Sequence, residues 1–436
     1  MCVAETKKDK PLAPLVGRMG GKGARHAPRR DPGPAVDDVR PPAAFGATGA
    51  TFNLTDDRPT TDARPARPIA RASSGDGEEV YLDDMYKPRG EYYFKPPKFV
   101  QRFLERNLHD VRDMEIAYLF FNIMTTQYPA LIALFVLPPS HILGAAYLVI
   151  FNVLYMQRFI LGMHYSTHRR LFKKESFFGL ADYINRFNIV IIAPTFGIPC
   201  NSYWLHHVVM HHVDNNEWNK DLSATEAYQR DNFLHWLVYL TRFMVGSWVE
   251  LPYYAFKRKR WDLFAGCTAG MYGSVAMYLY LRTINPVAAA WTCVAPFVVV
   301  SLAMMFGNWS QHAFVKPDDP RCNYGLAYTV LNHPDNQRSF NDGFHTLHHV
   351  NSQIHWSDFP NKFVEKLKEH ADKDALVFNG IGFFDVGFAL FFHRHGFLAD
   401  RYVNIGQKKR SRDEVIALLK ERLAPLKFDK ESKKAK

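Results

Sequence analysis

The chain has 436 residues, a hydrophobic fraction of 47% and a formal net charge of +11. Its five cysteines are widely spaced and form no CxxC pair, which excludes a disulfide framework and a zinc site built from thiolates. The positive charge is concentrated in the last part of the chain, from Lys408 onward, without any nucleic-acid-binding motif. We therefore expect it to face anionic lipid or an acidic redox partner rather than nucleic acid.

Residues 1–80 are rich in Pro, Arg, Ala, Gly and Asp and show almost no apolar periodicity. A segment of this kind cannot bury enough apolar surface to offset its ordering entropy, so we predict that it is disordered. It also lacks the apolar core of a secretory signal. Its arginines leave an organelle transit peptide as an alternative, although its many acidic residues argue against one.

Long apolar runs dominate the region from 81 to 405, which we interpret as one membrane domain followed by a basic cytosolic tail at 406–436. Each run has about 20 residues, enough to cross the hydrocarbon layer as a helix. Short turn-like segments join the runs in pairs. The sequence therefore predicts an all-α integral membrane protein with four transmembrane helices in two hairpins: Met114–Leu137 with Ile142–Leu161, and Leu263–Ile284 with Val287–Phe306.

Basic residues flank these hairpins on one side only, whereas the hairpin tips carry almost no Lys or Arg. The positive-inside rule places the tips in the lumen and everything else, including both termini, in the cytosol. The segments between and after the hairpins should then form a cytosolic helical cap. Within it, Phe187–Pro199 is too short to span and Phe233–Phe256 has the pattern of an interfacial amphipathic helix.

The 19 histidines include three clusters with a repeated spacing. The clusters read HxxxH (His164, His168), HHxxxHH (His206, His207, His211, His212) and HxxHH (His345, His348, His349). Histidines four residues apart project from one face of an α-helix, and all three clusters lie on the same predicted side of the membrane. This arrangement predicts that many imidazoles converge on one metal site near the ends of the spans.

The number of imidazoles bears on the metal. Imidazole binds zinc, copper and iron, but a structural zinc takes four ligands and a catalytic zinc only three. Eight or nine histidines therefore indicate at least two metal ions. Two irons would activate dioxygen against an unactivated C–H bond, which redox-inert zinc does not do. A zinc-dependent membrane hydrolase or receptor stays open as a less favoured alternative.

The three clusters and the two hairpins resemble the membrane fatty acid desaturase superfamily, over about residues 95–395. Asn308 and His312 also have the spacing of a further element in that superfamily, an asparagine that holds a metal-bound water and a histidine ligand four residues later. The resemblance implies an oxidoreductase that desaturates a fatty-acyl or lipid chain with O2 at a centre of two iron ions. The ligands that it implies are His164, His168, His207, His211, His212, His312, His345, His348 and His349.

The second cluster departs from the usual pattern, because it reads HxxxHH where most desaturases have HxxHH. The longer spacing is similar to that of alkane hydroxylases, so a lipid or alkyl hydroxylase remains the alternative function. The additional His206 is interpreted as lying outside the ligand set. The acidic residues that flank the clusters are candidates to orient the ligands: Asp214, Glu217, Asp221, Glu226, Asp342 and Asp358.

The histidines outside this pattern are interpreted as ordinary surface or interfacial residues: His235, His333, His355, His393 and His395. The haem-binding motif of a fused cytochrome b5 does not occur, so electrons should come from a separate donor. That donor would be cytochrome b5 in the endoplasmic reticulum, a location that the Lys433–Lys434 dilysine pattern favours, or ferredoxin in a plastid membrane. The sequence leaves the acyl carrier open, and does not exclude a sterol or a carotenoid substrate.

Overall fold

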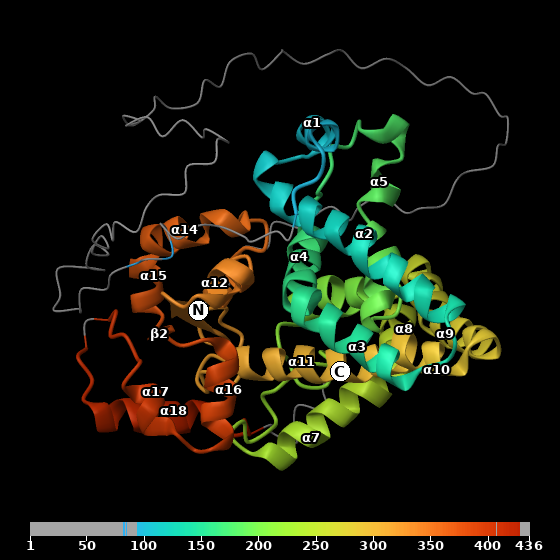
Figure 1. Cartoon of the computed structure of the whole chain (residues 1–436). Helices are drawn as coiled ribbons and strands as arrows, with labels where there is room; N and C mark the ends of the chain where they lie inside the picture. Colours follow the sequence, from blue (N-terminus) through green and yellow to red (C-terminus); the bar gives the residue numbers. More distant parts are fainter. Residues whose placement is uncertain (1–81, 83, 85–93, 407, 428–436) are drawn as a thin grey trace, which may run out of the picture. The chain divides into compact units, whose positions relative to one another are not determined.

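The computed structural model describes residues 82, 84, 94–406 and 408–427 (Figure 1). The segment predicted to be disordered and the dilysine pattern both lie outside these residues. The described part is mostly helical, with two short β-strands. It is therefore close to the all-α class that the sequence predicts.

The first apolar pair begins after the short helix α1 (Lys98–Asn107). Helix α2 (Met114–Val136) follows, and a turn at 137–140 leads into α3 (His141–Phe151). Ser140 caps α3 by accepting a hydrogen bond from the Leu143 amide at 3.3 Å. A π-helical turn, η3 (Asn152–Met156), connects α3 to α4 (Gln157–His168) without a break. This helical stretch therefore continues beyond the predicted end at Leu161 and carries the first histidine cluster.

The middle of the chain is less regular. It contains the short elements η4 (Phe177–Gly179), α5 (Ala181–Ile184), η5 (Asn188–Ile192) and η6 (Ala193–Phe196). The π-helix η7 (Trp204–His211) then runs into one turn of α6 (His212–Asp214). After a loop, α7 (Phe233–Thr241), η8 (Arg242–Gly246) and α8 (Ser247–Lys257) form one continuous helical stretch. It coincides with the amphipathic segment expected at the membrane interface.

The second apolar pair consists of α9 (Trp261–Ile284) and a stretch made of α10 (Pro286–Ala289), η9 (Ala290–Val294) and α11 (Ala295–Gln311). Asn285 caps α10 by accepting a hydrogen bond from the Ala288 amide at 3.0 Å. At Gly144 of α3, an added β-carbon would lie 2.2 Å from the Trp291 side chain. The absence of a side chain there lets the two apolar pairs approach closely.

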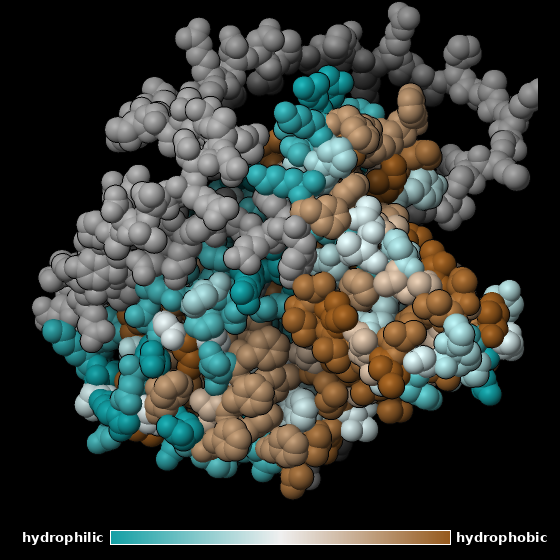
Figure 2. All heavy atoms as spheres, in the orientation of Figure 1, coloured by the Kyte–Doolittle hydropathy of each residue, from teal (hydrophilic) through white to brown (hydrophobic). Residues whose placement is uncertain are grey.

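Within the residues that the structure describes, three helical stretches are long and apolar enough to cross a membrane: Val111–Val136, His141–His168 and Pro286–Gln311. Among the described residues, α9 does not reach the same hydropathy because its glycines and tyrosines dilute its aliphatic residues. Three of the four predicted spans thus coincide with helical stretches that could cross a membrane, and the arrangement of four spans in two hairpins stays a prediction. Figure 2 shows hydrophobic side chains gathered over α3, α8, α9 and α10, and residues of α3 such as Ile142 (81%) and Val149 (61%) are exposed.

The C-terminal part is built on a parallel pair of strands, β1 (Tyr328–Leu331) and β2 (Leu376–Asn379), with Tyr328 opposite Leu376. Parallel strands need a long crossover, and here it holds η10 (Asp342–Phe344), α12 (Asp335–Arg338), α13 (His345–Val350), η11 (Trp356–Asp358), α14 (Phe359–Glu365) and α15 (Leu367–Asp372). The third histidine cluster therefore lies in this crossover.

Three helices follow the second strand: α16 (Phe383–Phe391), α17 (His395–Ala399) and α18 (Arg412–Leu423). Helix α18 begins with a capping box between Ser411 and Glu414. It buries Val415, Leu419 and Leu423 against the strands and α16. The described part of the predicted basic tail thus contains a helix that belongs to the hydrophobic core.

Candidate metal centre

The histidines predicted as ligands converge in the interior from four segments. Helix α4 contributes two, η7 with the start of α6 contributes three, the C-terminus of α11 contributes one and α13 contributes three. All are buried except His168 and His212, which are half-buried. The structure therefore brings together the complete predicted set, although their role as iron ligands stays a prediction.

One group of ligand atoms belongs to His164, His168, His207 and His348, and all four atoms lie within 4.8 Å of one another. The Nε2 atom of His207 lies 3.0 Å from that of His168 and 3.1 Å from that of His212. The His212 Nε2 atom in turn lies 2.9 Å from that of His348. Neighbouring imidazole nitrogens that share one metal at about 2.1 Å lie about 3 Å apart, so these spacings fit a common ion.

A second group consists of His211, His312 and His349, whose ligand atoms also lie within 4.8 Å of one another. His345 adjoins it, because its Nε2 atom lies 3.3 Å from the His312 Nε2 atom. The rings of His212 and His349 lie 4.7 Å apart, which makes His212 the link between the groups. The cluster thus has the donors for two ions rather than one.

The second cluster is positioned by a π-helix, not by the α-helix that the spacing predicted. In a π-helix the backbone hydrogen bonds join residues five apart instead of four, and the wider turn places His212 on nearly the same side as His207. Their Nε2 atoms accordingly lie 3.1 Å apart. The wider turn adds His212 to this side, while His211 still stacks on His207 with ring centroids 5.6 Å apart, so the expected convergence holds although the helix type differs.

Several ring nitrogens in the cluster are buried without a hydrogen-bond partner among the described residues: Nε2 of His164, Nδ1 of His348 and both nitrogens of His349. Burial, reinforced by neighbouring histidines, holds the pKa values of His207, His212, His348 and His349 well below the usual range. These imidazoles are therefore neutral and present lone pairs, as a metal ligand must.

Two of the flanking acids contact the cluster directly. Asp221 Oδ2 lies 2.7 Å from His211 Nδ1, and Asp342 Oδ1 lies 3.5 Å from His345 Nδ1. A backbone carbonyl serves His312 in the same way, with Leu326 O at 3.0 Å from its Nδ1. Each contact fixes the outer nitrogen of a ring and directs the other inward.

The remaining flanking acids pair elsewhere: Asp214 with Arg258, Glu217 with Lys220, Glu226 with Arg321 and Asp358 with Arg112.

Asp342 has two further partners that no pattern in the sequence predicted. Tyr165 donates to its Oδ1 at 3.1 Å and Gln311 to its Oδ2 at 2.5 Å. Only the meeting of α4, α11 and η10 reveals this network.

Asn308 lies on α11 beside the second group. Its Nδ2 donates to the Tyr239 hydroxyl at 2.7 Å and to the Ser223 carbonyl at 3.2 Å. The Ser223 hydroxyl also lies 3.2 Å from His211 Nδ1, so the amide is held next to a predicted ligand. The predicted water-holding role of Asn308 stays a prediction.

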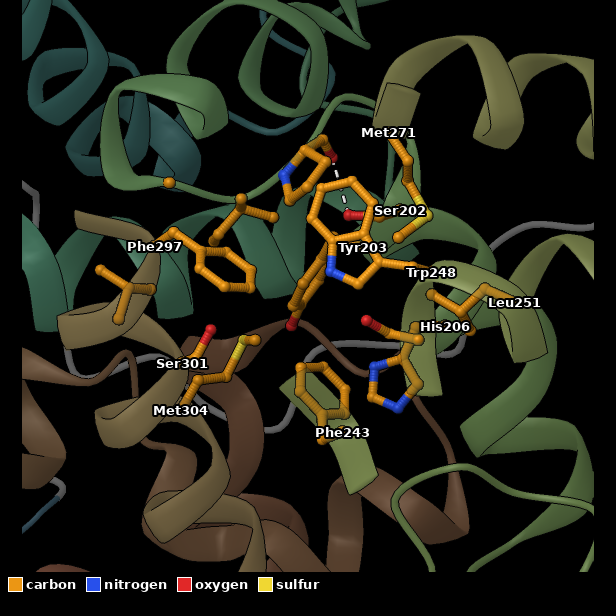
Figure 3. Close-up of a pocket in the computed structure, with 15 residues that line it drawn as sticks. Ser202, Tyr203, His206, Phe243, Trp248, Leu251, Met271, Phe297, Ser301 and Met304 are labelled. Atoms are coloured by element: carbon orange, nitrogen blue, oxygen red, sulfur yellow. Dashed lines mark hydrogen bonds between the residues drawn. The ribbon is translucent and has the colours of Figure 1, made fainter. Parts of the chain in front are cut away.

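A pocket adjoins the cluster (Figure 3). It is partly open to its surroundings, and its walls are mainly apolar, including Phe243, Trp248, Met271 and Phe297. The Tyr203 ring lines this pocket and also stacks on His207, with ring centroids 5.1 Å apart. One aromatic side chain thus separates an apolar pocket from the imidazoles.

The other residues that the sequence singled out have different places. His206 lines the pocket, and its buried Nε2 atom has no hydrogen-bond partner within the described part of the chain. Of the aromatic residues next to the clusters in sequence, Tyr203 lines the pocket, whereas Trp204 and Trp309 do not. His235 and His333 make ordinary polar contacts. The prediction of a surface or interfacial place for His355 was wrong, because this residue is buried and its Nε2 atom lies 3.0 Å from Asp113 Oδ1.

The family model described as fatty acid desaturase matches residues 101–381 of this chain, a range that contains every histidine of the cluster and Asn308. No curated protein and no solved structure matches the chain.

Proposed function

The chain belongs to the fatty acid desaturase family, and from this premise we propose that it is a membrane-bound di-iron oxidoreductase that desaturates a fatty-acyl or lipid chain with O2. The observation that carries the proposal is the convergence of nine imidazoles beside an apolar pocket. Three observations support this proposal. The family consists of oxidoreductases, the buried neutral imidazoles can bind metal ions, and the adjoining apolar pocket can hold an acyl chain.

We assign His164, His168, His207 and His348 to one iron and His211, His312 and His349 to the other, with His212 and His345 completing the two sets. Iron bound there would supply the activation of O2 and the removal of two hydrogens from neighbouring carbons. A zinc hydrolase is disfavoured because it would use only three of these imidazoles.

The surrounding side chains would orient the ligands. The Asp221 carboxylate accepts the Nδ1 proton of His211, and the Leu326 carbonyl accepts that of His312, so both rings turn Nε2 toward the centre. Asn308 donates through Nδ2 to Tyr239 and Ser223. Its Oδ1 is then left to accept a hydrogen bond from a water molecule in the site.

The pocket would hold the apolar chain of the substrate. Its aromatic and sulfur-containing walls exclude water, and Tyr203 connects them to the cluster through its hydroxyl, 3.2 Å from His164 Nδ1. A chain seated against Tyr203 lies next to the imidazoles. Which carbons are attacked depends on how this wall positions the chain.

We further propose that the protein is a multi-pass protein of the endoplasmic reticulum membrane with cytosolic termini, or of a plastid membrane as the alternative. The candidate spans and the basic flanks of the predicted hairpins support this assignment. Electrons would come from cytochrome b5, or from ferredoxin in a plastid, and an acidic donor suits the basic flanks.

The test is a lipid profile, by gas chromatography–mass spectrometry, of yeast that expresses the chain, with His349→Ala as the matched inactive variant. A new unsaturated species that is absent with His349→Ala is the expected result. A hydroxylated species instead would establish the alternative reaction, which the HxxxHH spacing keeps open. Purified protein that binds zinc in place of iron would contradict the di-iron proposal.

A further inference from the structure

A second group of metal-type side chains lies outside the nine-histidine centre. It consists of Asp231, in the loop before α7, His393, in the turn between α16 and α17, and His395, the first residue of α17. Asp231 Oδ2 lies 3.0 Å from His395 Nε2 and 3.4 Å from His393 Nδ1. All three ligand atoms lie within 4.8 Å of one another. Two segments far apart in sequence thus meet through one carboxylate oxygen and two imidazoles.

The carboxylate is held in a fixed orientation. Gln229 Nε2 donates to the other oxygen of Asp231, Oδ1, at 2.6 Å. The side chains of Asp231 and His395 are each only 10% exposed. With one oxygen occupied by an amide, Oδ2 is directed at the two imidazoles, and such support of the outer oxygen is common for carboxylates that bind metals.

His393 occupies a conformation that favours glycine. Its φ is +49°, and the turn that ends α16 is closed by hydrogen bonds from His393 N to Leu390 O (2.9 Å) and from Arg394 N to Ala389 O (2.7 Å). Glycine is the usual residue at this place because it lacks a β-carbon. The turn instead carries an imidazole next to Asp231, with its side chain 66% exposed. A residue with a β-carbon is strained in this backbone conformation, yet the His393 side chain lies beside the buried Asp231 carboxylate. This combination suggests that His393 has a role as a ligand.

We propose that Asp231, His393 and His395 form a second, separate site for a divalent transition metal ion, with zinc as the expected occupant. Two imidazoles and one carboxylate suit zinc, whereas magnesium and calcium prefer oxygen ligands throughout. The exposed side of His393 leaves room for water as the fourth ligand. The site does not depend on the reaction proposed for the nine-histidine centre.

The ion would tie the loop before α7 to the turn between α16 and α17. Helix α7 begins at Phe233, directly after its N-cap Asn232 and two residues after Asp231. It carries Tyr239, which accepts the hydrogen bond from Asn308. Zinc at this place would therefore stabilise the position of a helix that supports the main centre.

The experiment uses the full-length protein in detergent, loaded with iron, exposed to Zn²⁺ and then desalted. Zinc and iron per chain are measured by mass spectrometry of the elements, and Tm is measured with and without Zn²⁺. The variants are His393→Gln and Asp231→Asn. His333→Gln is the matched control, because His333 also lies 3.6 Å from two carboxylates, those of Asp335 and Asp385, but has no second imidazole in a ligand group with it.

Wild type and the control should retain one zinc per chain more than His393→Gln, at equal iron content, and their Tm should rise by several degrees with Zn²⁺. His393→Gln should lose both effects while it remains folded, because its side chain is mostly exposed. Equal zinc in all variants, or no rise of Tm in wild type, would show that the three residues form only an ion pair. Since iron is counted in the same sample, neither result depends on whether the protein acts as a desaturase.

Discussion

Two buried polar regions of this molecule, the surroundings of Arg230 and the histidine cluster, differ in how their polar atoms are satisfied. The Arg230 guanidinium is fully buried and donates from every nitrogen to backbone carbonyls, those of Thr225, Glu226, Tyr228, Ala313, Arg422 and Ala424. In the histidine cluster, by contrast, buried nitrogens of His164, His348 and His349 have no partner within the described part of the chain.

The difference separates a structural role from a binding role. An unsatisfied buried polar group costs about 1–3 kcal/mol, so a fold rarely leaves several in one place. Arg230 has all its partners inside the protein and holds the loop before α7 to the end of α18. The imidazoles need partners that the protein itself does not supply, and iron is the partner that we propose.

The largest effect is expected when two neighbouring histidines, one in the proposed ligand set and one outside it, are replaced separately. His207→Ala should lower activity by at least about 100-fold, because loss of an outer partner alone typically costs about 10–100-fold and His207 lies within 3.0 and 3.1 Å of two other imidazole nitrogens. His206→Gln changes the adjacent residue, which faces the pocket. Iron content per chain should fall in the first variant and stay at the wild-type value in the second. Equal iron in both would remove His207 from the ligand set.

A second test addresses the Arg230 side. Arg230→Met leaves several buried carbonyls without donors, so the free energy of unfolding should drop by at least about 3 kcal/mol, and Tm by roughly 4 °C or more. Arg258→Met is the control, since Arg258 pairs with Asp214 at 2.8 Å but is 44% exposed, and should cost less than about 1 kcal/mol. Both variants should keep wild-type iron content in the folded fraction. A loss of iron at constant Tm in Arg230→Met would contradict a purely structural role.

A smaller effect is expected at Asp221, whose carboxylate contacts the His211 ring from outside the cluster. Asp221→Asn removes the charged acceptor for His211 Nδ1, so iron affinity should decrease about 10–100-fold, as measured by competition with a chelator. Asp214→Asn is the matched control, because that carboxylate pairs with Arg258 and Tyr254 instead. Equal affinities in the two variants would mean that Asp221 does not position a ligand.

The smallest expected effect concerns a lone buried histidine outside both regions. Burial lowers the pKa of His370 from 6.5 to about 4, and its Nε2 has no partner among the described residues. The pKa of His370 is lower in the folded state than in the unfolded state. The contribution of the neutral His370 side chain to the free energy of unfolding is therefore fully present above pH 6.5 and is lost as the pH falls toward 4. Stability should drop by about 1 kcal/mol between pH 7 and 5.5 on this account. Tm of wild type and of His370→Gln is measured across this pH range. Wild type should lose Tm relative to the variant as the pH falls, by the amount that about 1 kcal/mol predicts. A difference in Tm that does not change with pH would contradict the lowered pKa of His370.

Much of the candidate centre could be predicted from the sequence. The spacing of the three clusters, with His312 and Asn308 from the resemblance, identified every histidine that the structure brings together. The outer partners could be predicted only in part. Six acidic residues flank the clusters with equal claims in sequence, but only Asp221 and Asp342 contact a ring. The packing of distant segments determines which acids contact the cluster, because it pairs Asp214 with Arg258 and Glu226 with Arg321 instead.

The sequence by itself determined the mostly helical class, the apolar runs and the identity of the clustered imidazoles, because hydropathy and short-range spacing are local properties of the chain. Only the tertiary structure decided that η7 is a π-helix, that Tyr203 separates the pocket from the cluster, and that Asp231 meets His393 and His395. The physical reason is that backbone register and contacts between distant segments depend on how the whole interior packs. A pattern of residues shows which side chains are present, but packing determines which atoms lie within bonding distance.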